Sequence, residues 1–321
     1  MDKVDLIEKF KADLVMRGLS NDTIKQYPLY IKALYKFANR DLLEVNEYIL
    51  AEYLGHLQEK GLAKSSIKRH FNGLSTFYEF LIWEKYISTN PVLPVRKHYL
   101  GRYKNKNTAQ RRKIISIDDA RHLIDIILEP QPLALVVLLL KTGIRRKECC
   151  ELDAASVDLE KMTLRIKPTG KRTGEIAYFD KETAYVLSEW LRRREKINKK
   201  NSPSLFLDRW GNRLAPNTLD RLFNKFAVAS GLHDPNSDKL EDQFTPHCCR
   251  HWFSTVLLER GCQREYVQQL RGDVGKEAID IYYHIDQNKL QQAYLDCIPQ
   301  LGIADYSDQD LCRKMGISIV E

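Results

Sequence analysis

The spacing of hydrophobic residues along the chain predicts a protein built mainly from α-helices. In the first 90 residues, apolar side chains recur every three or four positions, which is the pattern of a helix with one buried face. Ser20 and Asn21 stand where a helix start is expected, and Gly61 stands where one should end. The expected helices cover residues 4–14, 24–37, 45–60 and 65–85. We therefore predict a compact four-helix domain at residues 1–90.

The rest of the chain predicts a second, larger domain with helices and one β-hairpin. Ser116 and Asp119 have the spacing of a capping box. The apolar run from Leu133 lacks a polar face, which predicts a helix buried on all sides, and Gly143 should end it. The expected strands cover residues 162–167 and 175–179, and the expected helices cover 117–128, 133–141, a short segment from 145, 181–198, 216–229, 247–260, 265–271 and 277–294. The fold class is thus mainly α with a small antiparallel β-sheet: a helical domain precedes an α+β domain at residues 114–321, with a C-terminal tail from about residue 287.

Positive charge is concentrated between these two domains. The chain has 51 Lys and Arg against 43 Asp and Glu, a net charge of +8. Residues 1–90 hold 13 basic and 12 acidic side chains, and residues 114–321 hold 30 and 31, so both are nearly neutral. The segment 91–113 holds no acid, and its basic residues are Arg96, Lys97, Arg102, Lys104, Lys106, Arg111, Arg112 and Lys113. We predict an interdomain linker that contacts a polyanion, with a merely solvated linker as the alternative.

Other features of the composition exclude several protein classes. With 43% hydrophobic and 29% charged residues, the chain is neither disordered nor fibrous. Its longest apolar run, Leu133 to Leu140, is too short to span a bilayer, and acidic residues near Met1 argue against a signal peptide. Seven cysteines without metal-type spacing argue against a disulfide framework. We expect a cytoplasmic protein that does not act at a membrane.

Three short segments carry residues suited to phosphate chemistry. The segment T-G-I-R-R-K-E at residues 142–148 places Arg145 directly after the buried helix. The segment H-C-C-R-H at residues 247–251 places His247 and Arg250 on one face of a helix, and I-D-I-Y-Y-H at residues 279–284 supplies a phenol. Lys64, Lys68 and Arg69 open the fourth predicted helix, whose start could face a DNA phosphate or simply be solvated.

This set of groups predicts transesterification of a DNA backbone. Two guanidiniums can neutralise a pentavalent phosphate without a metal, a phenol can attack phosphorus and store the bond energy as an ester, and a histidine can move protons near neutral pH. We therefore expect no cofactor and no metal. A zinc site is the alternative use of four cysteines, Cys149, Cys150, Cys248 and Cys249, but adjacent cysteines on a helix point in different directions and suit burial.

On these motifs the chain resembles the tyrosine recombinase (phage integrase) family over nearly its whole length. That family has a helical, SAM-like core-binding domain, a basic linker and a catalytic domain. The segment T-G-I-R-R-K-E is similar to the family's T-G-L-R-x-x-E box, which implies that Arg145 is the first catalytic arginine and Glu148 its supporting acid. The segment P-H-C-C-R-H is similar to the H-x-x-R-H box, which implies catalytic roles for His247 and Arg250.

The third motif of the resemblance implies the nucleophile. L-R-G-D at residues 270–273 stands where the family has L-G-H, and the tyrosine nine positions after Asp273 is Tyr282, with Tyr283 as the adjacent competitor. Asp273 departs from the family's His or Trp, since a carboxylate donates a hydrogen bond to phosphate only when protonated, and it could instead anchor Arg271. The R-G-D and K-R pattern is similar to that of some archaeal integrases.

The resemblance implies a site-specific recombinase that acts on double-stranded DNA as a homotetramer. It would cleave each strand to a 3′-phosphotyrosine and a free 5′ hydroxyl, with Lys171, or else Lys167, protonating the leaving oxygen. The two domains would clasp DNA from opposite sides, and the tail after residue 287 would dock on a neighbouring protomer. Two alternatives stay open: a non-catalytic DNA-binding protein with the same fold, which Asp273 favours, and a DNA-relaxing enzyme of the type IB topoisomerase kind.

Overall fold

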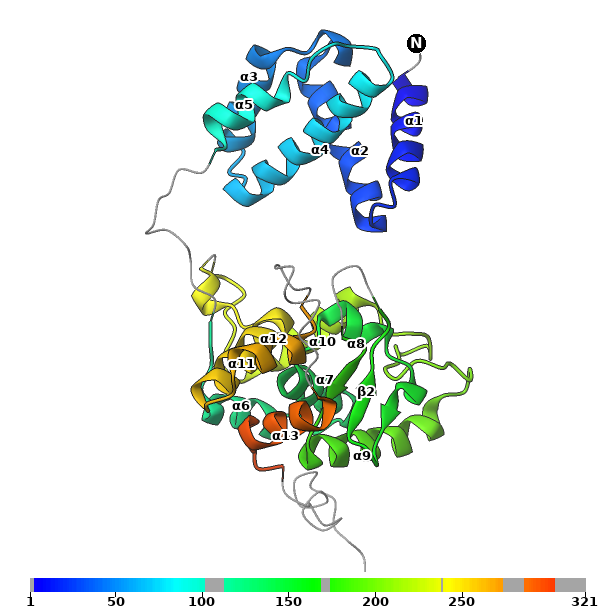
Figure 1. The fold of residues 1–321 in the computed structure, drawn as a ribbon, viewed down its shortest axis with the longest axis vertical. Coiled ribbons are helices and arrows are strands. Elements are labelled where there is room, and N and C mark those ends of the chain that lie inside the picture. Colours follow the sequence, from blue (N-terminus) through cyan, green and yellow to red (C-terminus); the bar gives the residue numbers. More distant parts are fainter. Residues whose placement is uncertain (1–2, 102–112, 169–173, 238, 274–285, 304–321) are drawn as a thin grey trace, which may run out of the picture. The chain divides into compact units, whose positions relative to one another are not determined.

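A computed structural model of the chain describes residues 3–101, 113–168, 174–237, 239–273 and 286–303 (Figure 1). The chain divides into two compact units, residues Met1–Thr108 and Ala109–Glu321. Each unit has its own apolar core. Two of the predicted catalytic residues, Lys171 and Tyr282, lie outside the described residues. The same is true of most basic residues of the predicted linker: Arg102, Lys104, Lys106, Arg111 and Arg112.

Over its described residues, 3–101, the first unit is a bundle of five helices. They are α1 (Lys3–Met16), α2 (Asn21–Ala38), α3 (Glu47–Glu59), α4 (Lys64–Trp83) and α5 (Val92–Tyr99), with a short 3-10 turn at Leu42–Glu44. Ser20 caps α2 by accepting a hydrogen bond from the backbone N–H of Thr23, which confirms the helix start read from the sequence. The core has an aromatic centre in which Phe10 of α1 packs edge-on against Phe77 of α4, with ring centroids 5.2 Å apart.

Helix α5 corrects the predicted extent of the linker. The segment 91–113 was expected to connect the domains throughout, but its apolar residues Val92 and Val95 are buried among α3 and α4. The side chain of Asn90 prepares this helix by accepting the backbone N–H of Val92 at 3.0 Å. Arg96 and Lys97 therefore belong to a helix of the first unit. The many basic residues of this segment obscured the helical spacing of its apolar residues. These apolar residues become buried only because they pack against α3 and α4.

The second unit surrounds one buried helix. The unit contains α6 (Ile117–Asp125), α7 (Pro130–Thr142), α8 (Arg146–Glu151), α9 (Lys181–Ile197), α10 (Pro216–Ala229), α11 (Pro246–Glu259), α12 (Arg264–Arg271) and α13 (Gln287–Cys297). Helix α7 lies in the middle, with α9 and α11 packed against it (Figure 1). Ten of its residues are buried, as its all-apolar sequence predicts. The capping box of Ser116 and Asp119 is present at the start of α6.

A small antiparallel sheet lies beside the helices, with strand order β1-β2-β3. The strands are β1 (Val157–Asp158), β2 (Thr163–Arg165) and β3 (Ile176–Tyr178), and Leu164 pairs with Val157 on one side and Ala177 on the other. The predicted hairpin is thus present in shorter form. The two-residue strand β1 was not predicted, because two residues show no alternation.

The C-terminal region is described over residues 286–303. The expected helix 277–294 begins within the described residues only at Gln287, because Asp286 caps it by accepting the backbone N–H groups of Asn288 and Lys289. Residues 287–303 of the tail pack on their own unit, and the docking of the tail on a neighbouring protomer stays a prediction. Tyr294 is fully buried there and donates its hydroxyl to the backbone oxygen of Lys141 at 3.0 Å. This stretch is part of the domain because its apolar side is covered within one chain.

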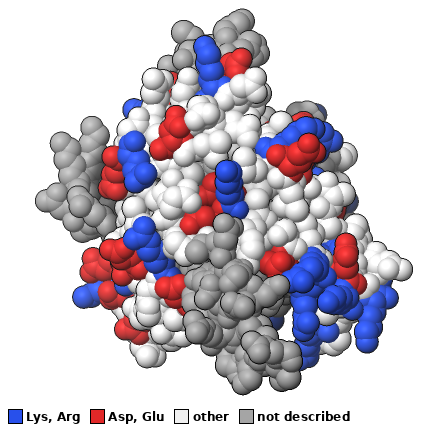
Figure 2. Space-filling model, turned by 90° about the horizontal axis from the view of Figure 1, so that it is seen from below, with Lys and Arg blue, Asp and Glu red and all other residues white. Residues whose placement is uncertain are grey.

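On the surface shown in Figure 2, many acidic groups lie next to basic ones, and several basic side chains gather at the lower right. Among the described residues, no helix is both long and apolar enough to cross a membrane.

Candidate active site

The end of α7 sets the position of the first arginine. Gly143 adopts a left-handed conformation with φ of 58°, and its N–H bonds to the carbonyl of Leu139 at 3.2 Å. A Cβ atom at this position would lie 2.5 Å from a ring carbon of Phe253 on α11. The chain therefore leaves α7 tightly against α11 and presents Arg145 at the start of α8.

Replacing Gly143 with alanine is expected to destabilise the second unit by about 2–4 kcal/mol, since the side chain meets both an unfavourable φ and Phe253. Gly231 provides the matched control. It has a φ of 71° after α10, but a Cβ there meets nothing within 4 Å, so Gly231→Ala should cost only the backbone strain, about 1 kcal/mol. Urea unfolding of the two variants measures the difference. Equal losses would show that the contact with Phe253 is unimportant.

Glu148 holds Arg145 in place. Its carboxylate accepts the backbone N–H of Arg145 at 2.7 Å and the Nη1 group of the same side chain at 2.9 Å. Glu148 is buried, whereas the side chain of Arg145 is 28% exposed. A buried acid thus fixes a partly exposed guanidinium, and the supporting role of Glu148 in catalysis stays a prediction.

Arg250 is held from three directions. Its side chain is only 4% exposed, and it donates to the carbonyl of Gly143 at 2.7 Å, to the carbonyl of Arg271 at 2.9 Å and to the carboxylate of Asp273 at 2.5 Å. Burial lowers the pKa of Arg250 to about 10, and nearby Asp273 opposes this by raising it. The group therefore stays a cation at neutral pH.

Asp273 brings the two predicted arginines together. Its Oδ1 atom accepts from Nη2 of Arg145 at 2.6 Å and from Nη2 of Arg250 at 2.5 Å. Its Oδ2 atom lies 3.1 Å from Nε of Arg271, which confirms the expected contact between these neighbours. Residues far apart in the sequence thus converge on one carboxylate at the end of α12. The arrangement is a cluster of three guanidiniums around a single anion.

His247 occupies a different setting from Arg250 on the same helix. It lies in the first turn of α11 with an exposed side chain, while Arg250 is buried. The ring of His247 packs edge-on against that of His251, with centroids 4.8 Å apart. An exposed imidazole at a helix start can exchange protons with solvent or with a bound substrate.

Of the two lysines predicted as candidate general acids, Lys167 and Lys171, the structure describes only Lys167. Lys171 lies outside the described residues. The Nζ atom of Lys167 is 3.1 Å from Oδ2 of Asp153, whose other oxygen accepts from Arg213 at 2.5 Å. Burial raises the pKa of Asp153, but the bonds from Arg213 and Lys167 outweigh it and hold that pKa below its usual range. Lys167 thus has an acidic partner, and the preference for Lys171 stays a prediction.

The adjacent cysteines form part of the core. Cys149, Cys150, Cys248 and Cys249 are all buried, and burial raises the pKa of Cys150 to about 12 and those of Cys149 and Cys249 well above the usual range. Thiols in such surroundings stay protonated, whereas a zinc ligand is a thiolate. Among the described residues, no group of His, Cys, Asp and Glu is placed to hold a metal ion.

Sequence reasoning missed a buried ion cluster around Lys141 of α7. Lys141, fully buried on α7, donates to Asp180 at 2.5 Å, to Glu182 at 2.6 Å and to the carbonyl of Pro299 at 2.7 Å. Glu182 in turn accepts the backbone N–H groups of Leu301 and Ile303. The sequence did hold a signal for this cluster, because Lys141 directly follows the apolar run Leu133 to Leu140 in a helix expected to be buried. A buried cation requires partners.

Comparisons with known proteins agree with this architecture. The Phage integrase family matches residues 113–289, and its N-terminal SAM-like domain matches residues 6–87. Tyrosine recombinase XerC of Pediococcus pentosaceus is 26% identical, with 92% of this chain and 99% of that protein covered. Tyrosine recombinase XerD of Halalkalibacterium halodurans is 26% identical over 89% of this chain and 94% of that protein. These relatives are bacterial, and the archaeal similarity stays a prediction.

Among solved structures, a lambda integrase dimer bound to a core site has a similar fold, with a TM-score of 0.65 and 19% identity over 89% of this chain and 98% of that one. The Tn1549 transposon integrase in complex with circular intermediate DNA also reaches 0.65, at 18% identity over 90% and 98% of the two chains. The family match over residues 113–289, more than half of the chain, defines an enzyme that recombines DNA at specific sites. The chain belongs to the phage integrase, or tyrosine recombinase, family.

Proposed function

We propose that this chain is a site-specific DNA recombinase that cleaves and rejoins DNA strands through a 3′-phosphotyrosine intermediate, with neither metal nor ATP. The observation that carries the proposal is the convergence of Arg145 and Arg250 on one anionic oxygen, at 2.6 and 2.5 Å. A non-bridging oxygen of a phosphodiester has the charge and the acceptor geometry to take the same two donors. Membership of the family supports the same activity.

Each step of the reaction has a candidate residue. The phenol oxygen of Tyr282 attacks phosphorus, and the bond from phosphorus to the 5′ oxygen breaks, which leaves a phosphotyrosine and a free 5′ hydroxyl. His247 accepts the phenol proton, and Lys171 gives a proton to the leaving oxygen. Arg145 and Arg250 stabilise the added charge on the pentavalent phosphate. Attack of a 5′ hydroxyl on the phosphotyrosine reverses these steps and rejoins a strand, so the ester conserves the bond energy.

The proposed partners are double-stranded DNA and further copies of the chain. The lambda integrase structures include a dimer on a core site and a tetramer on a Holliday junction, and we propose a tetramer on DNA for this chain. We propose that the tail after residue 287 contributes to the contacts between copies. We place the reaction in the cytoplasm.

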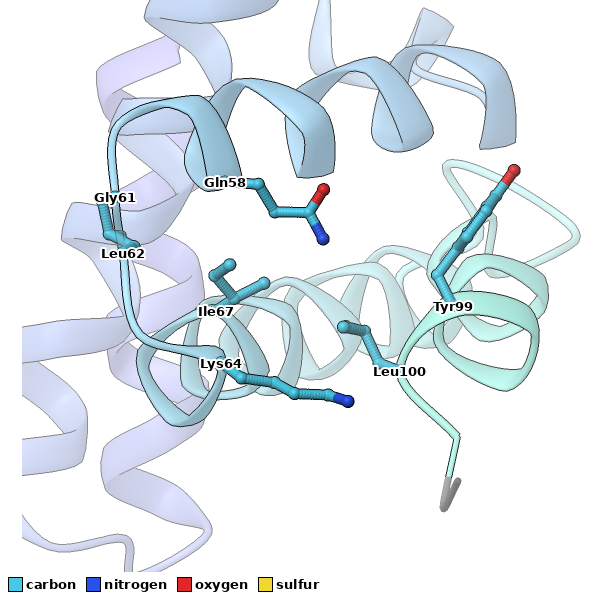
Figure 3. A pocket seen from close by; sticks show the side chains of 7 residues that line it. All are labelled: Gln58, Gly61, Leu62, Lys64, Ile67, Tyr99 and Leu100. Carbon is cyan, nitrogen blue, oxygen red and sulfur yellow. The ribbon is translucent and has the colours of Figure 1, made fainter. Parts of the chain in front are cut away.

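The first unit offers a candidate contact for the DNA backbone at the start of α4. No side chain caps this helix, which leaves backbone N–H groups open beside exposed Lys64 and Arg69 and half-buried Lys68. A pocket of about 340 Å³ lies next to it, lined by Gln58, Gly61, Leu62, Lys64, Ile67, Tyr99 and Leu100 (Figure 3). The polar ends of Gln58 and Lys64 extend from α3 and α4 toward α5, which carries Arg96 and Lys97 (Figure 3). We propose that DNA phosphates contact this surface.

The basic segment should contribute to the salt dependence of DNA binding. Replacing Arg102, Lys104 and Lys106 with glutamine is expected to flatten the log-log slope of affinity against salt by roughly 0.9 per lost phosphate contact. A control with the same loss of charge on α9, at Arg192, Arg193 and Lys196, should leave the slope nearly unchanged. Fluorescence anisotropy at several salt concentrations measures both. The same slope for all three proteins would remove the segment from the DNA interface.

Covalent chemistry tests the proposed function most directly. The chain is mixed, in the presence of a chelator, with nicked duplexes cut from the DNA that flanks its own gene, and the products are run on a denaturing gel. A protein–DNA adduct is expected for the native chain and for Tyr283→Phe, but not for Tyr282→Phe. Tight binding without an adduct in any of the three would support the non-catalytic alternative. Relaxation of supercoiled DNA without exchange of ends would support the topoisomerase alternative.

A further inference from the structure

Asp273 occupies the donors that a phosphate would use. One oxygen of its carboxylate receives hydrogen bonds from the Nη2 atoms of both Arg145 and Arg250, at 2.6 and 2.5 Å. The side chains of Arg145 and Asp273 are 28% and 31% exposed, whereas that of Arg250 is only 4% exposed. The carboxylate therefore lies at the solvent-accessible side of the cluster, where an incoming anion would arrive.

Neither arginine depends on Asp273 for its position. Glu148 holds Arg145 by its backbone N–H and its Nη1 group. Arg250 is buried and is anchored by two backbone carbonyls, those of Gly143 and Arg271, at 2.7 and 2.9 Å. Carbonyls and a buried acid thus orient both guanidiniums. The bonds to Asp273 are additional: Arg145 makes its bond through Nη2, which does not contact Glu148, and Arg250 makes its bond through the Nη2 group that also donates to the carbonyl of Arg271.

Asp273 also has an alternative partner. It directly follows Gly272, which ends α12 in a left-handed conformation with φ of 61°. Its second oxygen lies 3.1 Å from Nε of Arg271, whose side chain is half-buried. A small rotation of the carboxylate could keep the ion pair with Arg271 while it releases Arg145 and Arg250. The carboxylate would then keep one of its three ion pairs when an anion takes its place.

We propose that Asp273 is an internal phosphate mimic that closes the arginine pair in the free protein and competes with the scissile phosphate for it; this inference rests on the proposed function. The charges of the cluster support competition. Three guanidiniums face two carboxylates, those of Glu148 and Asp273, so the free site has a net charge of about +1. Asp273 thus lowers the affinity for any phosphate and makes entry depend on its displacement.

Binding of inorganic phosphate to the full chain tests the competition without any DNA cleavage. Asp273→Asn keeps the shape of the side chain and removes its charge, so it should lower the dissociation constant for phosphate by about tenfold relative to the native chain. The matched control is Asp220→Asn, because Asp220 pairs with Arg146 and its side chain is also 31% exposed. That control should leave phosphate affinity unchanged. Adding Arg145→Ala to Asp273→Asn should remove the gain.

Isothermal titration calorimetry measures the dissociation constant for phosphate of each variant. Equal or weaker phosphate binding in folded Asp273→Asn would overturn the proposal and show that the carboxylate organises the arginines. If Asp273→Asn and Asp273→Ser both fail to fold, the carboxylate is a structural counterion, which also overturns it. The proposed function fails separately: a tenfold gain without a DNA adduct would refute cleavage alone, whereas an adduct without the gain would refute the mimic alone.

Discussion

Replacing Arg145 with alanine is expected to slow DNA cleavage by at least about a thousandfold while much of the DNA binding remains. The variant loses one of two guanidiniums that face the reacting phosphate, and such a group acts mainly when charge builds up in the transition state. Binding depends on many phosphate contacts along the duplex, so one arginine contributes little to it. Rates of adduct formation on nicked duplexes, and binding of the same duplexes, measure the two effects separately.

Arg146 provides the matched control for this experiment. It is the next residue, it begins α8, and it pairs with Asp220 rather than with Asp273. Arg146→Ala should therefore leave the cleavage rate within a few-fold of the native value. Arg145→Lys is a stricter test of the geometry, because an ammonium cannot bond Glu148 and the phosphate through one planar fork. Cleavage by Arg145→Ala at the native rate would refute the phosphate clamp.

Replacing Lys141 with methionine is expected to destabilise the second unit by about 3–5 kcal/mol. Methionine fills a similar volume, but it leaves the carboxylates of Asp180 and Glu182, which are 3% and 9% exposed, without their shared cation. It also removes the bond to the carbonyl of Pro299. Because Glu182 holds the backbone of Leu301, faster hydrogen exchange is expected at that amide as well.

A surface ion pair supplies the comparison for Lys141. Lys161 lies 3.5 Å from Asp158, and its side chain is 76% exposed, so Lys161→Met should change the free energy of unfolding by less than about 1 kcal/mol. Adding Asp180→Asn to Lys141→Met should recover part of the loss, since it removes one of the two unpaired charges. Chemical denaturation measures all three variants. A loss as small as that of Lys161→Met would show that the buried cluster has little net effect.

Much of the secondary structure could be predicted from the sequence, because periodicity and capping act over a few residues. The buried helix around Leu138, the capping box at Ser116 and the stop at Gly143 all follow from local rules. The predictions failed where the signal was weak or mixed. Helix α5 is rich in basic residues, and β1 is too short to show alternation.

The sequence by itself determined which groups this protein has for chemistry: the order of its motifs identified Arg145, Arg250, His247 and Tyr282 as candidates before any fold was known. Only the tertiary structure decided that Arg145 and Arg250 share one oxygen of Asp273. The physical reason is the distance along the sequence between the residues that interact. Helix periods and caps depend on neighbours along the chain, whereas the meeting of side chains over 100 positions apart depends on how α7, α11 and α12 pack.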